Sequence, residues 1–482
     1  MNILDATRDP HLFARWFERG DWSAWFAFLA ALFALPLDDD QRRIFEACTG
    51  RSQPTREPCK EAWLVVGRRG GKSFVTALVA VFLAAFHDYR PYLQPGERGT
   101  VLILAADRKQ ARTILRYVRG LLENVPMLAA LVERDTADGI DLKTRVSIEI
   151  HTASFRATRG YTVVAALCDE VAFWRSEETA NPDVEIINAL RPGMATIPNA
   201  MLLGLSSPYS RRGVLYDAHR RYFGQDDAPV LVWQADTRTM NPTVPEHVIA
   251  EAFERDAAAA SAEYGAEFRR DLEAFVSREA LEQCTAPGVL ELPPVAMLPE
   301  GRAPAYVAFV DPSGGSRDSM TLAIAHEENG IAVLDCVREW KPPFNPDDVA
   351  REAAAVVKSY GLASVTGDAY GGEWPRERFS AHGIGYQLAS KPRSRLYLEL
   401  LPRLNAGTCQ LLDHSRLLAQ LGALERRTSR AGRDTVDHPP RTHDDVANAA
   451  AGALIAVRSR IPIGEIILVE SIMAREFWDG YI

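Results

Sequence analysis

The clearest chemical signature in the sequence is the stretch GRRGGKSF, residues 67–74. A phosphate-binding loop wraps phosphate oxygens with consecutive backbone N–H groups and a helix amino terminus, while a lysine reaches the β- and γ-phosphates. The residues that would supply the flexible backbone, the cation and a hydroxyl for Mg²⁺ are Gly67, Gly70, Gly71, Lys72 and Ser73. The usual pattern requires glycine where Val66 stands. The stretch therefore predicts a nucleotide site that is one residue short, or a GKS triplet that occurs in a turn by chance.

An acidic pair further along the chain favours the nucleotide site. The apolar run VVAALC at 163–168 has the pattern of a buried strand, and Asp169 and Glu170 follow it directly. An ATPase needs one carboxylate for Mg²⁺ and another to activate the attacking water. The alternative is a solvated acidic pair at a strand end, but the order of loop and pair indicates an ATPase.

Three carboxylates in the second half of the chain suit a different chemistry. Asp311 ends the strand pattern AYVAFVD, Asp368 ends SVTGD, and Asp444 lies near the start of the helical pattern HDDVANAAAGAL. Carboxylates from separated elements can hold a pair of divalent ions that clamp a phosphodiester, and oxygen ligands select Mg²⁺ or Mn²⁺. Asp318 and Asp445 are predicted as secondary ligands. Singly, each aspartate also fits a turn or cap, and Asp444 fits a helix cap.

The elements that must position these residues follow from the apolar pattern. Continuous apolar runs that alternate with helical patterns predict a parallel sheet covered on both faces. The runs are 62–66, 100–106, 145–152, 163–168, 201–205 and 230–235. A helical stretch is expected at 245–275, and the Pro-rich segment that follows predicts a linker. A second alternation of strands and helices begins at 305.

These patterns predict five segments. They are an N-terminal helical segment at 1–35, an ATPase domain at 36–284, a linker at 285–304, a nuclease domain at 305–460 and a tail at 461–482. The apolar run at 22–37 is shorter than the roughly 20 residues that span a bilayer. We therefore expect it to form a buried or partner-facing helix.

The composition limits the class of protein. A chain of 482 residues, 47% hydrophobic and 25% charged, is typical of a globular protein with at least two domains. Its net charge of −9 gives no overall attraction to nucleic acid, so contact with DNA would use local basic patches. The basic patches, which also fit solvated surface, lie at 211–212, 220–221, 391–395 and 426–433. Six cysteines without a CxxC pair predict reduced thiols in a cytosol.

Four features together resemble the large terminase subunit of tailed bacteriophages and prophages. They are the loop GRRGGKS, the strand end LCDE, the segment GLSSPYSRRGVLYD and the acidic strand ends of the second half. In that family the loop is one residue short and carries an additional arginine. The resemblance covers roughly residues 36–458. It implies an α/β fold, with a P-loop ATPase domain on a mainly parallel sheet followed by an RNase H-like nuclease domain.

The resemblance also implies roles for single residues. The matched positions are Lys72 and Ser73 for phosphate and Mg²⁺, Arg68 for the additional loop arginine, Asp169 for the metal carboxylate, Glu170 for the catalytic carboxylate and Gln41 for a glutamine that contacts adenine. Ser206 and Ser207 match a segment that couples hydrolysis to domain movement. Arg159 matches an arginine that acts across a subunit interface, with Arg156 as the alternative.

The implied function is that of a DNA-packaging motor subunit, which uses ATP to translocate double-stranded DNA into a procapsid and cuts concatemeric DNA with a two-metal endonuclease. Its cofactors would be ATP with Mg²⁺ in one domain and Mg²⁺ or Mn²⁺ in the other. Its partners would be DNA, a portal protein, a terminase small subunit and further copies in a ring, without a membrane. It would act in the cytoplasm of the infected bacterial host and not as a stable virion component. A helicase–nuclease of DNA repair and a nuclease-dead prophage structural remnant remain alternatives.

Overall fold

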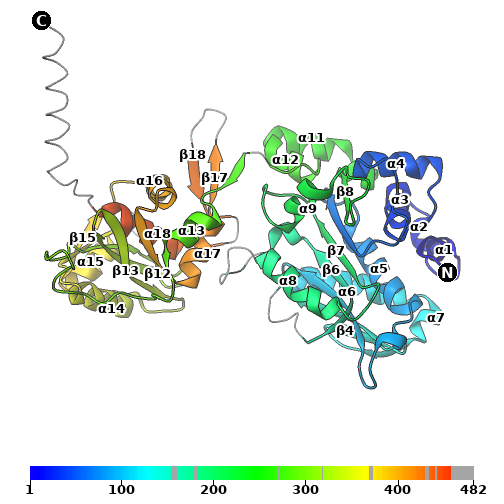
Figure 1. The fold of residues 1–482 in the computed structure, drawn as a ribbon, viewed down its shortest axis with the longest axis horizontal. Coiled ribbons are helices and arrows are strands. Elements are labelled where there is room, and N and C mark those ends of the chain that lie inside the picture. The colour runs from blue at the N-terminus through cyan, green and yellow to red at the C-terminus, as the bar shows by residue number, and fades with distance from the viewer. Residues whose placement is uncertain are drawn as a thin grey trace, which may run out of the picture. The chain divides into compact units, whose positions relative to one another are not determined.

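The chain folds into two compact units that divide between Glu273 and Ala274 (Figure 1). The computed structural model describes residues 1–153, 160–174, 176, 182–269, 271–316, 318–368, 373–428, 434–439 and 442–457. The first unit contains the described residues up to Glu273, and the second contains those from Ala274 onward.

An eight-stranded sheet with the order β3-β4-β5-β2-β6-β7-β1-β8 forms the centre of the first unit. Its strands are β1 (Glu61–Val66), β2 (Gly99–Ala105), β3 (Val132–Asp135), β4 (Gly139–Leu142), β5 (Val146–Thr152), β6 (Thr162–Asp169), β7 (Met201–Ser206) and β8 (Leu231–Ala235). The pairs from β5 to β8 are parallel, whereas β3 and β4 form an antiparallel edge. The six apolar runs and the mainly parallel α/β sheet predicted from the sequence are thus confirmed.

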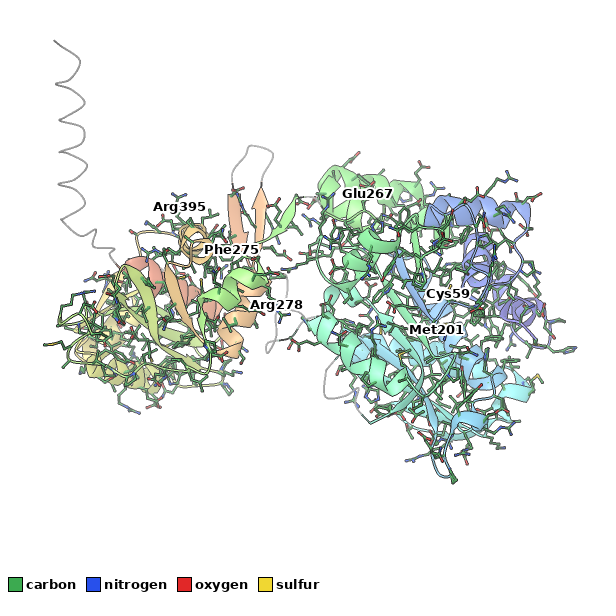
Figure 2. All side chains as sticks on the ribbon, in the orientation of Figure 1. Cys59, Met201, Glu267, Phe275, Arg278 and Arg395 are labelled. Atoms are coloured by element: carbon green, nitrogen blue, oxygen red, sulfur yellow. The ribbon has the colours of Figure 1, made fainter. Side chains whose placement is uncertain are left out.

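Helices cover both faces of this sheet (Figure 1). Alternate strand side chains point to opposite faces, so Leu64 packs in one hydrophobic cluster and Trp63 and Val65 pack in another. The helices are α1 (Ile3–Arg8), α2 (Ala14–Phe17), α3 (Ser23–Leu32), α4 (Asp39–Thr49), α5 (Lys72–Phe86), η1 (Arg90–Tyr92), α6 (Arg108–Glu123), α7 (Pro126–Ala129), η3 (Val171–Phe173), α8 (Pro182–Met194), α9 (Val214–Tyr222), α10 (Thr237–Met240), α11 (Glu246–Arg255) and α12 (Ala257–Glu263). Cys59 and Met201 lie inside this core (Figure 2).

The apolar run at 22–37 forms α3, whose Trp25 and Phe28 are fully buried. Both residues belong to the core cluster of the first sheet. The segment at 1–35 is therefore part of the first unit. In the described part of the chain, no helix is both long and apolar enough to cross a membrane.

The helical stretch expected at 245–275 is shorter and consists of two helices. Between α11 and α12 the backbone of Asp256 is extended, with φ −154°. Its carboxylate accepts a hydrogen bond from the N–H of Ala259 at 3.0 Å and so begins a new helix. After α12 the chain leads into the short strand β9 (Leu272–Ala274).

The Pro-rich segment at 285–304, expected as a linker, is fastened to the second unit. The N–H of Leu292 donates to the carbonyl of Asp335 at 2.8 Å, and that of Val295 donates to the hydroxyl of Tyr306 at 3.0 Å. The boundary between the units lies before this segment. Its non-proline residues keep N–H donors that can bond to the sheet and its neighbours.

A seven-stranded mixed sheet with the order β10-β16-β13-β12-β11-β14-β15 forms the centre of the second unit. Its strands are β10 (Thr285–Ala286), β11 (Val307–Asp311), β12 (Met320–Glu328), β13 (Ile331–Trp340), β14 (Ser364–Gly367), β15 (Gly385–Leu388) and β16 (Cys409–Leu412). Strands β11, β12 and β13 are antiparallel neighbours, and β14 and β15 run parallel to β11. The second alternation of strands and helices predicted from residue 305 onward thus forms one mixed α/β sheet.

One helix packs closely on the middle of the second sheet. The helices of this unit are α13 (Arg278–Cys284), α14 (Pro346–Ser359), α15 (Trp374–Ala381), α16 (Arg393–Asn405), α17 (Ser415–Ala423) and α18 (Asp445–Ala456), and a hairpin consists of β17 (Glu425–Thr428) and β18 (Asp434–Asp437). Helix α18 contacts β11, β12 and β13. A Cβ atom at Gly452 would lie 2.3 Å from the ring of Phe309 on β11, so only glycine allows this approach.

Candidate active sites

The predicted phosphate-binding loop is the turn between β1 and α5. Val66 is the last residue of the buried strand, and Lys72 and Ser73 are the first two residues of the helix. Gly67 has no room for a side chain, because a Cβ atom there would lie 2.3 Å from Oγ1 of Thr237. The strand–turn–helix arrangement is present, and the turn begins one residue later than in the usual pattern.

Lys72 is buried and its ammonium group lies inside the loop. The Nζ atom donates to the carbonyls of Val66 at 2.9 Å and Gly67 at 3.3 Å, and it lies 3.5 Å from Oε1 of Glu170. A buried charge needs such partners. Phosphate oxygens form stronger, charge-assisted hydrogen bonds than these carbonyls, so the ammonium is placed to bind them.

Asp169 ends β6 and has one satisfied and one unsatisfied oxygen. Its Oδ2 accepts from Nε2 of Gln110 at 2.9 Å, whereas Oδ1 has no partner among the described residues. The pKa of Asp169 is raised to about 7, chiefly by burial and then by the charge of Glu170, whereas the charge of Lys72 lowers it. A buried carboxylate oxygen without a partner, beside a phosphate loop, fits a Mg²⁺ ligand. Gln110 was not identified from the sequence.

Glu170 is held in an unusual backbone conformation, with φ 52°. Few residues other than glycine adopt this left-handed region, and they often mark functional positions. Its Oε2 accepts from Oγ of Ser206 at 3.1 Å and from N and Oγ of Ser207 at 3.3 and 3.4 Å. Ser206 is the last residue of β7, the strand beside β6, and Ser207 follows it. They fix the carboxylate next to Lys72.

The other residues predicted for this site have partners of their own or lie outside the described residues. Arg68 forms an ion pair with Glu263 of α12 at 3.2 Å. Gln41 forms a capping box at the start of α4, in which its Oε1 accepts from the N–H of Asp38 at 3.1 Å. The structure thus gives Gln41 a helix-capping role. Arg159 and its alternative, Arg156, lie outside the described residues.

In the second unit, a single side chain joins two of the predicted carboxylates. Asp311 ends β11 and Asp368 follows the neighbouring strand β14. Nδ2 of Asn448, on the first turn of α18, donates to Oδ2 of Asp311 at 2.9 Å and to Oδ2 of Asp368 at 3.2 Å. Asn448 is buried, and its Oδ1 has no partner among the described residues. The role of Asn448 was not predicted from the sequence, in which its only indication is its position one helical turn after Asp444.

The electrostatics of this cluster favour a bound cation. The pKa of Asp311 is raised to about 8, chiefly by burial and also by the nearby carboxylates of Asp445, Asp368 and Asp444, whereas the hydrogen bond from Asn448 lowers it. A divalent cation would relieve this repulsion. The donors are carboxylate and amide oxygens, which fit Mg²⁺ or Mn²⁺.

The carboxylate of Asp444 is hydrogen-bonded to two side chains of α16. This buried carboxylate accepts from Nη1 of Arg393 at 2.7 Å and from the hydroxyl of Tyr397 at 2.8 Å. It makes no hydrogen bond to the first turn of α18 among the described residues, so it is not a side-chain cap. This arrangement anchors the start of α18 to α16.

Asp445 is the first residue of α18. Of the neighbouring charges, that of Asp445 acts most strongly on Asp311, and its own carboxylate accepts from the N–H of Ser319 at 3.2 Å. Asp318 pairs with His443 at 3.4 Å. Across the described ranges, no three His, Cys, Asp or Glu side chains converge closely enough to hold a metal ion. The assembled part of the site is thus Asp311 and Asp368 with their bridging amide.

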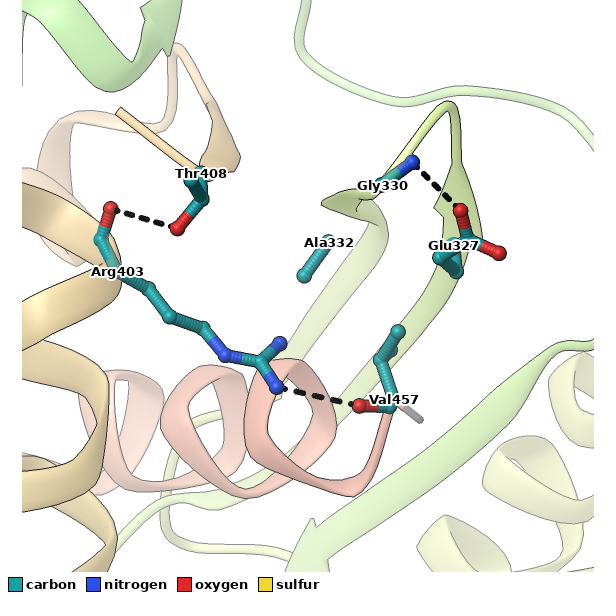
Figure 3. Close-up of a pocket in the computed structure, with 6 residues that line it drawn as sticks. All are labelled: Glu327, Gly330, Ala332, Arg403, Thr408 and Val457. Carbon is teal, nitrogen blue, oxygen red and sulfur yellow. Dashed lines mark hydrogen bonds between the residues drawn. The ribbon is translucent and has the colours of Figure 1, made fainter. Parts of the chain in front are cut away.

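The pocket in Figure 3 contains none of the predicted residues. It is lined by Glu327, Gly330, Ala332, Arg403, Thr408 and Val457, with a volume of ≈ 140 Å³. Arg403 donates to the carbonyls of Leu454 at 2.7 Å and Val457 at 3.3 Å, which ends α18. Ligand pockets usually measure about 300–1,000 Å³, so this one is better explained as a gap around a helix terminus.

Comparison with known proteins gives similarity only to solved structures. No family model matches the sequence, and no curated protein matches it. The large terminase of bacteriophage HK97 is 16% identical, with 82% of this chain and 91% of that chain covered and a TM-score of 0.37. The large terminase nuclease of thermophilic phage G20c with bound magnesium is 19% identical over 38% of this chain and 98% of that chain, with a TM-score of 0.31. The large terminase nuclease domain of Thermus phage P74-26 is 19% identical over 39% of this chain and 98% of that chain, with a TM-score of 0.32.

Proposed function

We propose that the chain is a large terminase subunit, which hydrolyses ATP to translocate double-stranded DNA and cuts that DNA with a metal-dependent endonuclease. The observation that carries the proposal is the presence of two sites of matching chemistry in one chain. Lys72 meets Glu170 in the first unit, and Asn448 joins Asp311 to Asp368 in the second.

In the ATPase, the loop and Lys72 would hold the phosphates, and Ser73 and Asp169 would hold Mg²⁺. The ion, when bound, supplies positive charge at the β- and γ-phosphates. Glu170 accepts a proton from the attacking water. Because the side chains of Ser206, at the end of β7, and Ser207, directly after it, bond to this carboxylate, a change in the position of β7 would move the catalytic base.

In the nuclease, Asp311, Asp368 and Asp445 would hold divalent ions, which lower the pKa of a bound water and stabilise the leaving oxygen. Asn448 sets the spacing of the first two carboxylates. Asp444 was predicted from the sequence as the third ligand. We propose Asp445 in its place, because the carboxylate of Asp444 is bonded to Arg393 and Tyr397 of α16.

The proposal extends to the partners that the motif resemblance implies. These are double-stranded DNA, a portal protein, a terminase small subunit and further copies of the chain in a ring, with Arg159 acting across an interface. The place of action would be the cytoplasm of an infected bacterial host. Its support is the resemblance of the ordered motifs to those of large terminases.

The test is incubation of the purified protein with plasmid and Mn²⁺, with and without ATP. We expect Asp311→Ala to abolish cleavage and leave ATP hydrolysis nearly intact, and Lys72→Ala to do the reverse. Asp348→Ala changes a half-exposed aspartate on α14 and serves as the control. Cleavage that persists in Asp311→Ala or in chelator would refute the nuclease. ATP hydrolysis that persists in Lys72→Ala would refute the ATPase.

A further inference from the structure

We propose that three side chains from outside the phosphate-binding loop hold it in its binding conformation before a nucleotide arrives. This inference rests on the proposed ATPase and adds residues to it that no motif indicates. The three donate to consecutive loop carbonyls: Oγ1 of Thr237 to Arg68 at 2.8 Å, Nδ2 of Asn241 to Arg69 at 2.7 Å, and Nε1 of Trp25 to Gly70 at 2.8 Å. We call these three side chains the carbonyl clamp.

The carbonyl clamp determines where the loop N–H groups point. In a planar trans peptide the C=O and the following N–H point in opposite directions. Carbonyls of 68–70 that are bonded outward therefore turn the N–H groups of 69–71 to the other side of the loop. The N–H of Gly70 accordingly faces the carbonyl of Gly67 at 3.2 Å, the same carbonyl that Nζ of Lys72 contacts at 3.3 Å. The N–H of Gly70 and the ammonium of Lys72 thus lie on the same side of the loop.

The clamp also stabilises a backbone conformation that the loop sequence disfavours. Arg69 has φ 64°, in the left-handed region where a Cβ atom is crowded. The carbonyl of this residue is the one that Asn241 holds. Without an external donor, Arg69 would be expected to relax toward a common backbone conformation, and its peptide would turn with it.

The clamp residues are themselves fixed. Oδ1 of Asn241 accepts from the hydroxyl of Thr243 at 2.6 Å and from its N–H at 3.3 Å. An amide oxygen held by donors leaves the NH₂ group for the carbonyl of Arg69, which sets the orientation of the amide. Thr237 and Trp25 are fully buried, so water does not compete for their donors. A pre-ordered loop loses less conformational entropy when it binds phosphates.

Two variants test the clamp, each lacking one donor. Asn241→Ala and Thr237→Val are compared with the parent by calorimetric titration with MgADP, and by amide hydrogen exchange of the peptide at 64–75 without nucleotide. We expect the Kd for MgADP to rise roughly 2- to 10-fold in each, the range for loss of one neutral hydrogen bond. We also expect the amides of the loop to exchange faster.

A matched control removes the same kind of bond elsewhere. Asn124 ends α6, and its Nδ2 donates to the carbonyl of Gly120 at 2.8 Å. Asn124→Ala should therefore leave both readouts at parent values. Asn241→Asp, which keeps the side-chain size but cannot donate, replaces Asn241→Ala if a thermal melt shows that the alanine variant does not fold.

The two readouts separate the clamp from the proposed ATPase. Parent affinity together with parent exchange rates in the Asn241 and Thr237 variants would overturn the clamp. If the parent bound no MgADP, the ATPase proposal would fail, and hydrogen exchange alone would still decide whether these side chains hold the loop.

Discussion

Burial disfavours the ionised form of Asp311, although a carboxylate must be ionised to bind the divalent ions proposed for this site. Burial and the neighbouring carboxylates raise its pKa to about 8, against roughly 3.9 for aspartate in an unfolded chain. Without metal, the folded protein therefore binds one more proton than the unfolded chain between about pH 4 and pH 8. The stability that this proton contributes is complete at low pH and is lost as the pH rises through the folded pKa.

This loss of stability with rising pH leads to a prediction for Asp311→Asn. In EDTA at pH 8.5 the amide keeps the shape of the side chain without a buried charge. We expect a gain on the order of 1 kcal/mol in the free energy of unfolding, or roughly 2–4 °C in Tm for a domain of this size. At pH 5 the gain should be much smaller, because the difference in stability builds up between about pH 4 and pH 8. Differential scanning calorimetry at the two pH values checks this, and a variant less stable than the parent at both would contradict the raised pKa.

The adjacent pair Asp444 and Asp445 gives a second prediction. Asp445→Asn should weaken Mn²⁺ binding, measured by titration calorimetry, about tenfold or more and leave the thermal stability near that of the parent. Asp444→Asn should do the opposite and destabilise the metal-free protein by about 1–3 kcal/mol, because Arg393 loses its buried ion-pair partner and keeps only the more exposed Asp437. If Asp444→Asn abolished Mn²⁺ binding in a folded protein, Asp444 would be the ligand, as first predicted from the sequence.

Glu170→Gln separates nucleotide binding from hydrolysis. The amide has the shape of the carboxylate but cannot accept a proton from water. We expect MgATP affinity within about threefold of the parent, and kcat lower by roughly 10²–10⁴. Titration with a non-hydrolysable nucleotide and a phosphate-release assay measure the two effects. Parent turnover in the variant would mean that another residue is the base.

At the scale of elements, α18 determines whether the metal site forms. Asn448 and Gly452 are one helical turn apart, so they share a face of α18. Gly452 lets this face approach Phe309 on β11. The hydrogen bond of 2.9 Å from Asn448 to Asp311 therefore depends on Gly452, because a side chain at position 452 would push the helix away from β11.

We therefore expect Gly452→Ala to destabilise the second unit by about 1–3 kcal/mol through overpacking, and to weaken Mn²⁺ binding. The matched control is Gly120→Ala on α6, where a Cβ atom would meet nothing within 4 Å. This control should stabilise the first unit by roughly 0.4–1 kcal/mol. Chemical denaturation of both variants tests the pair. Equal stability changes in the two would show that α18 has room to move.

The elements that could be predicted from the sequence are those with a local signal. Strand β6 is a continuous apolar run, and the glycine-containing turn at 67–71 is followed directly by Lys72. The missed residues interact over long sequence separations. Asn448 gives no signal as an asparagine in a helix, because its role requires knowing that β11 and β14 are neighbours. Likewise, the capping aspartate Asp256 was hidden in a stretch with otherwise helical composition.

For the whole molecule, the segment predicted as a linker at 285–304 follows the division between the two units at Glu273 and Ala274. Prolines at 285–304 suggested a linker, and the pattern gave no indication of the bonds that attach this segment to β13 and to Tyr306. Such bonds depend on which strand edge is exposed next to the segment. That exposure is a property of the folded sheet and not of the local sequence.

The opening of each unit can be measured by alkylation of its cysteines, because each unit contains three of them. All six are buried and free, with Cys48, Cys59 and Cys168 in the first unit and Cys284, Cys336 and Cys409 in the second. Burial raises the pKa of every one of these thiols. Alkylation should therefore wait for an opening event. We expect MgADP to slow iodoacetamide labelling of the first three and Mn²⁺ to slow that of the last three, as read by peptide mass spectrometry. If either ligand protected all six equally, the two units would open as one.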